Sequence, residues 1–187
     1  MGTIWEHPEL GRLEFSRRRD AWMGVIDVPA FRQFTHTWDD HIPGRCGLII
    51  SAQDKADTPS AQAIALALRL VTNQERLVRQ IITALWDDFG GRGPRSGMWW
   101  HADLEQVVES GEGEDVPPLE SADALLGWMH PNGIIVRHGG IRSDALPMIE
   151  LTCSAVFEVE HGVGILTDGE TILGTGYLYD VEPFKIP

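Results

Sequence analysis

Residues 61–89 read AQAIALALRLVTNQERLVRQIITALWDDF and form the longest regular pattern in the chain. The larger apolar side chains recur at spacings of 4, 3, 7, 4 and 3 residues: Ile64, Leu68, Val71, Val78, Ile82 and Leu85. Such spacings place apolar side chains along one face of an α-helix. We therefore expect one amphipathic helix from about Ala61 to Phe89.

Both ends of this helix carry local signals. Thr58 or Ser60 can cap its start, because a side-chain oxygen there accepts a hydrogen bond from an unpaired backbone N–H. Gly90-Gly91 is expected to end it, since glycine readily adopts the conformation that closes a helix. At about 1.5 Å per residue the helix would be about 40 Å long, which leaves a break near Thr72-Asn73 open as an alternative.

Apolar runs flank the helix on both sides and predict strands. Before the helix, strands are expected at 10–15, 22–28 and 47–52, the first two joined by a polar turn at 16–20. After the helix, strands are expected at 133–137, 148–157, 162–167 and 170–174. Asp168-Gly169 is the strongest hairpin signal in the chain. Short helices are expected at 104–108 and, with Ser121 as its cap, at 121–129.

This order of elements predicts a single α+β domain, with a largely antiparallel sheet and one long and one short helix packed on one face. The expected parts are a β-rich opening (10–53), the helix (60–89), an irregular acidic segment (90–120), the short helix (121–129) and a β-rich closing part (133–176). A domain of this size buries about 70% of its unfolded surface, so its stability requires neither a metal nor a disulfide.

The charge of the chain is unevenly distributed. The formal net charge is −13, yet residues 1–100 carry 12 basic and 12 acidic side chains. Residues 101–187 carry 16 acidic and 3 basic side chains, so the imbalance belongs to the second half. Proteins that bind nucleic acid or anionic lipid need a basic surface. The composition therefore argues against nucleic acid and membrane as partners.

Two further features of the sequence indicate the cellular compartment of the protein. The chain shows neither a signal-peptide pattern nor an apolar stretch of membrane-spanning length, and we expect a cytoplasmic protein. Cys46 and Cys153 lie beside apolar runs, without the spacing of a metal site or a redox motif. Buried free thiols are the expectation, as in a reducing compartment, and a single disulfide is the alternative.

The most suggestive chemical cluster is the sequence Glu-Val-Glu-His-Gly at residues 158–162. In a strand, Glu158 and Glu160 would project to one face about 7 Å apart, and His161 to the other. Two carboxylates and an imidazole can bind a divalent metal or move protons. A metal site needs three or four convergent ligands, however, and this segment offers at most two on one side. The plainer interpretation is a strand end whose turn is held by hydrogen bonds from these side chains.

Three other places hold candidate binding residues: Asp39, Asp40 and His41 in one loop, Glu112, Glu114 and Asp115 in the acidic run 103–115, and Asp168 in the hairpin. The acidic run suits a basic partner or Ca²⁺, although it lacks the EF-hand pattern. Solvated polar turns are the plainer interpretation of the first two places. The sequence contains no phosphate-loop or nucleophile-elbow motif, and we expect no cofactor and no metal.

Residues 157–165, Phe-Glu-Val-Glu-His-Gly-Val-Gly-Ile, resemble the C-terminal Glu-His-Gly signature of an uncharacterised bacterial family, domain of unknown function 6985. Residues 10–14 with Trp22-x-Gly24 resemble the opening hairpin of that family, and residues 59–66 the start of its long helix. Residues 134–136 and 149–153 resemble its closing strands. The family often has Trp-Asp before Glu-His-Gly, where this chain has Phe157-Glu158-Val159, which leaves any metal-binding Asp in doubt.

This resemblance covers residues 10–176 and implies no enzymatic activity, because none is established for the family. It implies relatives that are small cytoplasmic proteins of the kind found near bacterial toxin and immunity genes. Such an association bears on function only as an analogy.

These observations lead to three hypotheses. The first is a non-enzymatic protein-binding module, immunity-like, whose acidic half attracts a basic partner such as a toxin. The second is a metal-binding or hydrolytic enzyme that uses Glu158, Glu160 and His161, joined in space by Asp39, Asp40 or His41. The third is a homodimer formed through an exposed strand edge.

Overall fold

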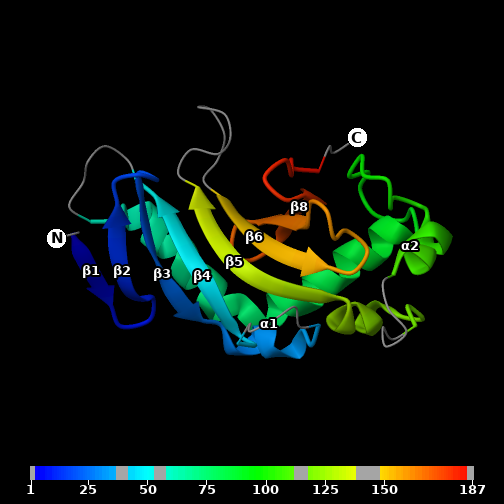
Figure 1. The fold of residues 1–187 in the computed structure, drawn as a ribbon, viewed down its shortest axis with the longest axis horizontal. Coiled ribbons are helices and arrows are strands. Elements are labelled where there is room, and N and C mark those ends of the chain that lie inside the picture. The colour runs from blue at the N-terminus through cyan, green and yellow to red at the C-terminus, as the bar shows by residue number, and fades with distance from the viewer. Residues whose placement is uncertain (1–2, 37–41, 53–57, 112–117, 138–147, 185–187) are drawn as a thin grey trace.

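The computed structural model describes residues 3–36, 42–52, 58–111, 118–137 and 148–184 (Figure 1). Within them, one eight-stranded sheet follows the order of the chain from β1 to β8. Its strands are β1 (Ile4–His7), β2 (Gly11–Ser16), β3 (Ala21–Asp27), β4 (Arg45–Ser51), β5 (Met129–Arg137), β6 (Met148–Ala155), β7 (Val163–Thr167) and β8 (Ile172–Tyr177). The helical elements are η1 (Pro29–Gln33), α1 (Ala61–Phe89), α2 (Leu104–Ser110) and η2 (Ala122–Gly127). The predicted α+β class is confirmed.

The long connection between β4 and β5 determines the architecture. These two strands are the parallel pair of the sheet, and the other neighbouring pairs are antiparallel. Parallel neighbours need a crossover connection, which usually contains a helix. Here the crossover contains α1, which runs across one face of the sheet in Figure 1.

Helix α1 is continuous, so the alternative of a break near Thr72-Asn73 is wrong. The Ser60 side chain accepts a 3.2 Å hydrogen bond from the backbone N–H of Ala63, and Gly90 caps the other end. Gly91 follows with a φ of 66°, a left-handed conformation that glycine adopts without strain.

The predicted apolar stripe of α1 is displaced in the first half of the helix. Ile64, Leu68 and Val71 are only half-buried at the rim of the core. The positions that face the sheet are buried: Ala63, Leu66, Ala67 and Leu70. The predicted stripe left out Leu66 and Leu70 as well as the two small alanines, so in this half of the helix it lies about one position from the buried face.

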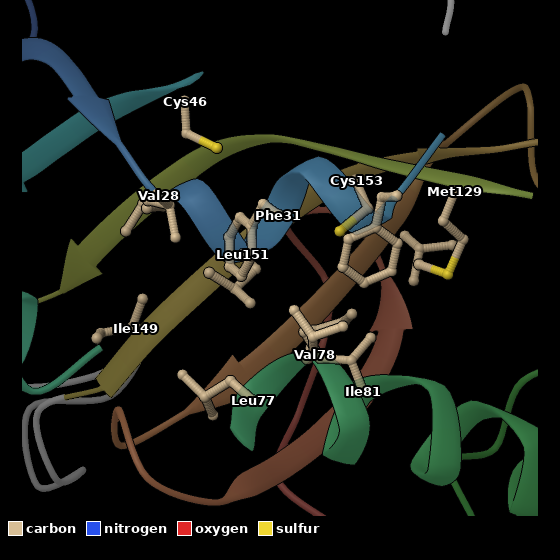
Figure 2. Close-up of a cluster of buried hydrophobic side chains, with 14 of the residues drawn as sticks. Val28, Phe31, Cys46, Leu77, Val78, Ile81, Met129, Ile149, Leu151 and Cys153 are labelled. Atoms are coloured by element: carbon tan, nitrogen blue, oxygen red, sulfur yellow. The ribbon is translucent and has the colours of Figure 1, made fainter. Parts of the chain in front are cut away.

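The core lies between α1 and the sheet. Figure 2 shows Leu77, Val78 and Ile81 of α1 facing Ile149 and Leu151 of β6, with side chains of η1 beside them. Cys46 and Cys153 belong to this core as buried free thiols. Burial raises the pKa of the Cys46 thiol to about 12 and also raises that of Cys153.

The opposite face of the sheet is partly covered by the C-terminal strap, which we define as residues 178–184. A buried carboxylate, Glu150, anchors this strap: it accepts a 2.8 Å hydrogen bond from the backbone N–H of Tyr179. Arg137 compensates the charge of Glu150, with its Nε 3.0 Å from Oε2. A Cβ at Gly174 would lie 2.3 Å from the Glu182 carbonyl oxygen, so glycine is needed for the strap to dock.

Several predicted boundaries needed correction. Strand β1 was not predicted. Strand β5 was predicted to start at residue 133 but starts at Met129. A register shift between Pro131 and Gly133 accommodates the proline within the strand. The segment predicted as a helix at 121–129 is the 3₁₀ helix η2, and the Ser121 side chain makes no capping hydrogen bond. The loop between β7 and β8 spans four residues, 168–171.

Candidate functional site

The segment that contains Glu158, Glu160 and His161 is a turn, so the two glutamates do not project to one face as they would in a strand. β6 ends at Ala155 and β7 begins at Val163. The chain reverses because the N–H of Gly162 donates to the Glu158 carbonyl, and Gly162 has a φ of 71°. Glu158 is therefore buried, at 7% exposure, whereas Glu160 and His161 are exposed.

The Glu158 carboxylate is bound by groups from two segments. Trp99 donates its indole Nε1–H to Oε2 at 2.8 Å. The Nδ1 of His161 lies 3.0 Å from Oε1, and the His161 backbone N–H donates to the same oxygen at 3.4 Å. An ionised carboxylate only accepts hydrogen bonds, so the Nδ1–H of His161 is the donor when Glu158 is ionised. This arrangement agrees with the interpretation of a turn held by its own side chains.

A second buried carboxylate, Asp88, lies at the end of α1 and was missed in the sequence. Asp88 is 1% exposed and accepts from Trp100 Nε1 at 2.6 Å. Nδ1 of His101 contacts the other oxygen, and the Thr175 hydroxyl lies 3.5 Å from Oδ2. Its position offered a signal, because Asp88 follows the buried Ile81 and Leu85 at the spacing of the apolar stripe.

One turn thus donates hydrogen bonds to both Glu158 and Asp88. The consecutive residues Trp99, Trp100 and His101 bind Glu158 and Asp88, which belong to the β6–β7 turn and to α1. Trp100 is also the centre of an aromatic cluster that contains Phe89, Phe157 and Tyr177, with ring centroids 5.6 to 6.5 Å from its own. The turn therefore fixes the end of the helix to the end of the sheet.

Tyr177 lies close to the β6–β7 turn, and the charges of that turn affect its pKa. Its ring lies 4.8 Å from the ring of His161. Burial raises the pKa of the Tyr177 hydroxyl, and the negative charges of Glu158 and Glu160 raise it further. The two carboxylates therefore act on the same phenol, although only Glu158 is buried.

A cavity of about 210 Å³ opens beside the turn and is lined by Glu158, Glu160, His161, Asn132 and Ser154, among others. Within the parts of the chain that the structure describes, no three His, Cys, Asp or Glu side chains are arranged to hold a metal ion. Asn132 is engaged with its neighbours: it donates to the Ser154 hydroxyl at 2.9 Å and accepts from Thr152 at 2.8 Å.

The other predicted residues divide into two groups. Asp168 stabilises the β7–β8 loop, where Oδ1 accepts from the N–H groups of Glu170 and Thr171, each at 2.8 Å. Burial alone would raise the pKa of Asp168, but these hydrogen bonds and the charge of Arg69 lower it overall. The remaining candidates lie outside the described residues: Asp39, Asp40, His41, Glu112, Glu114 and Asp115.

Exposed acidic side chains gather on the later elements. Those of Asp103, Glu105, Glu109, Glu120, Asp123, Glu160, Asp180 and Glu182 are exposed or half-exposed. Figure 1 shows α2 toward one end of the long axis and β1 toward the other. We call this set of eight residues the acidic end. No ion pair involves any of them in the described part of the chain.

Comparison with known proteins identifies a family for this chain. The model of a family described as "Domain of unknown function (DUF6985)" matches residues 10–181. No curated protein and no solved structure shows significant similarity to the chain. Among the described residues, no helix combines the length and apolar character that crossing a membrane requires.

Proposed function

Because the chain belongs to the DUF6985 family, whose function is unknown, we propose a function from geometry and charge: the protein is a binding module whose acidic end recognises a basic protein. The observation that carries the proposal is the set of unpaired acidic side chains on α2, the segment 120–123, the β6–β7 turn and the strap. Concentrated charge of one sign steers an oppositely charged partner and accelerates its association.

Among the described residues, no Lys or Arg side chain forms an ion pair with a member of the acidic end. Within the described part of residues 101–187, Arg137 is the one Lys or Arg, and Glu150 already compensates it. Arg76 of α1 pairs with Glu170, which lies outside the acidic end. The charge is therefore available to a partner, and we propose a basic cytoplasmic protein such as a toxin in this role.

The proposal is tested by capture at increasing salt. The full chain is immobilised and exposed to extract of its source cells at about 50 mM salt, and bound protein is eluted in steps to about 500 mM. Interactions between exposed charges weaken as the Debye length falls from about 10 Å at 0.1 M to about 3 Å at 1 M. We expect a basic protein to bind at low salt and elute within this range. Recovery of no basic protein at low salt would contradict the proposal.

The alternative is a metal-binding or hydrolytic enzyme that uses Glu158, Glu160 and His161. The observation in its favour is the hydrogen bond between Glu158 and His161, since a carboxylate that holds one imidazole nitrogen leaves the other as a base or ligand. Against it, Glu158 is already engaged by Trp99, and Glu160 lies on the exposed side of the turn. Calorimetric titration with Zn²⁺ and Mn²⁺ distinguishes the two, because the alternative requires binding that His161→Ala abolishes.

A homodimer through a strand edge remains a prediction. β1 is one outer strand of the sheet, and its first residue, Ile4, is 47% exposed. Light scattering at several concentrations tests this, and a constant monomer mass would contradict it.

A further inference from the structure

A cavity of about 500 Å³ lies at the outer edge of β8. β8 is the last strand in the sheet order and pairs with β7 alone among the described strands. One wall of the cavity is the loop 95–98, and the other is the part of the strap from Asp180 to Phe184. Thr175 and Gly176 of β8 form its floor.

The cavity is lined by two segments on either side of β8. The Thr175 side chain points toward α1, where it meets Asp88, whereas Gly176 faces Val181 of the strap. The loop 95–98 thus approaches the edge from the helix side and the strap from the other side. An extended chain that entered between them would lie alongside β8.

The edge of β8 can form main-chain hydrogen bonds. An edge strand directs part of its N–H and C=O groups away from its single neighbour, where another chain can pair with them. The strap already uses two carbonyl groups of β8: the N–H of Asp180 donates to the Tyr177 carbonyl at 3.1 Å, and the N–H of Phe184 donates to the Leu173 carbonyl at 2.7 Å. Thr175 comes two residues later in β8 and lies in the cleft.

The cleft also has a charge preference. Asp180 and Glu182 are exposed on the strap wall, and Arg95 is exposed on the opposite wall, with no ion pair to any of the three among the described residues. With two carboxylates and one guanidinium in its lining, the cleft favours a cationic ligand.

We propose that an extended basic segment of the partner binds in this cleft as an added strand along β8, with its basic side chains next to Asp180 and Glu182. This inference rests on the proposed function and specifies where and how the partner binds. Main-chain pairing supplies affinity in such complexes, and the alternating side chains supply specificity.

The test uses a defined probe, the peptide acetyl-Lys-Val-Lys-Val-Lys-Val-amide, titrated into the full chain and followed by NMR. We expect shifts in residues 95–98 and 172–184. Two N-methylated versions of the peptide each block one alternate set of amides. Strand addition predicts that one version binds at least tenfold more weakly and that the other retains most of the affinity. Equal binding of both versions, or no binding of the parent peptide, would overturn the inference.

Charge variants give an independent readout with opposite signs. Asp180→Lys should weaken binding of the peptide about fivefold, and Arg95→Glu should strengthen it by a similar factor. Arg79→Glu, at an exposed position of α1 away from the cleft, is the matched control and should have little effect. Shifts confined to α2 and residues 120–123 would overturn binding at β8 and leave the proposed function standing. If the cleft variants behave as expected and no basic protein is captured from extract, the proposed function fails instead.

Discussion

The indole Nε1–H of Trp99 donates a 2.8 Å hydrogen bond to Oε2 of Glu158, 59 positions later in the chain. It joins the turn after α1 to the turn between β6 and β7. Hydrogen bonds to a charged acceptor stabilise a protein by about 1.5–3 kcal/mol. We expect Trp99→Phe to lower the free energy of unfolding by about that amount in denaturant titrations.

The matched control for this bond is Trp86→Phe. Trp86 is also half-buried, and its ring stacks against Arg92, a contact that Phe preserves in part. The loss for Trp86→Phe should be smaller. Equal losses for the two variants would show that Trp99 contributes through packing and not through its bond to Glu158.

Tyr177 offers a direct probe of the two carboxylates. Its pKa is raised by burial and by the charges of Glu158 and Glu160, so the neutral phenol is favoured in the folded protein. Its contribution to stability is complete below the unfolded pKa of about 10 and is lost as the pH rises through the folded value. In Tyr179→Phe, which leaves one tyrosine, absorbance at 295 nm should show ionisation above pH 10.

In the double variant Tyr179→Phe/Glu160→Gln, one of the two negative charges that act on Tyr177 is removed. The pKa of Tyr177 should then move down toward its ordinary value, because less negative charge opposes ionisation. Glu170→Gln, an exposed carboxylate that does not contribute to the shift, is the control. An unchanged titration curve in Glu160→Gln would contradict the arrangement of the turn.

The strap depends on glycines in β7 and β8. In Gly174→Ala, the new Cβ would lie 2.3 Å from the Glu182 carbonyl oxygen, so the strap must shift. Overpacking of this kind costs about 1–3 kcal/mol. We expect a lower denaturation midpoint and faster proteolysis near residues 180–184.

Gly47→Ala is the control for the strap, since its Cβ would meet no described atom closer than 3.8 Å. It should change stability by less than Gly174→Ala and leave proteolysis of the strap unchanged. Similar proteolysis of both variants would argue that the strap is not held by the close approach at Gly174.

The two thiols should be protected in the folded state. Cys46 and Cys153 are buried, and burial raises the pKa of Cys46 to about 12. A thiol reagent reacts with the thiolate, so little reaction is expected at pH 8. Both thiols should react after unfolding. Rapid reaction of the native protein would contradict the described core.

Local sequence patterns specify the long helix of this fold and miss the first edge strand. Helix 61–89 was predicted within its observed bounds, because its apolar period, the cap at Ser60 and the glycines after Phe89 agree. The closing strands β6, β7 and β8 were recognisable because each contains a short apolar run. β1 was missed, since four residues at a sheet edge give too short a pattern.

The candidate site was only partly predictable. The pairing of Glu158 with His161 is local, and hydrogen bonding within the turn was one of the interpretations of the sequence. The contact of Trp99 with Glu158 and the burial of Asp88 depend on tertiary packing, so no local pattern specified their partners. The strand assignment of 148–157 failed because apolar Val156 and Phe157 belong to the turn and still face the core.

The central claim is that the acidic end binds a basic protein, and charge reversal tests it most directly. Capture from extract at about 50 mM salt is compared for the wild type and for Glu105→Lys/Glu109→Lys/Asp123→Lys. The control, Glu6→Lys/Glu9→Lys/Glu14→Lys, makes the same change at exposed positions of the β1–β2 region. We predict that the first variant loses the basic partner and that the control retains it. Equal capture by the two variants would contradict the claim.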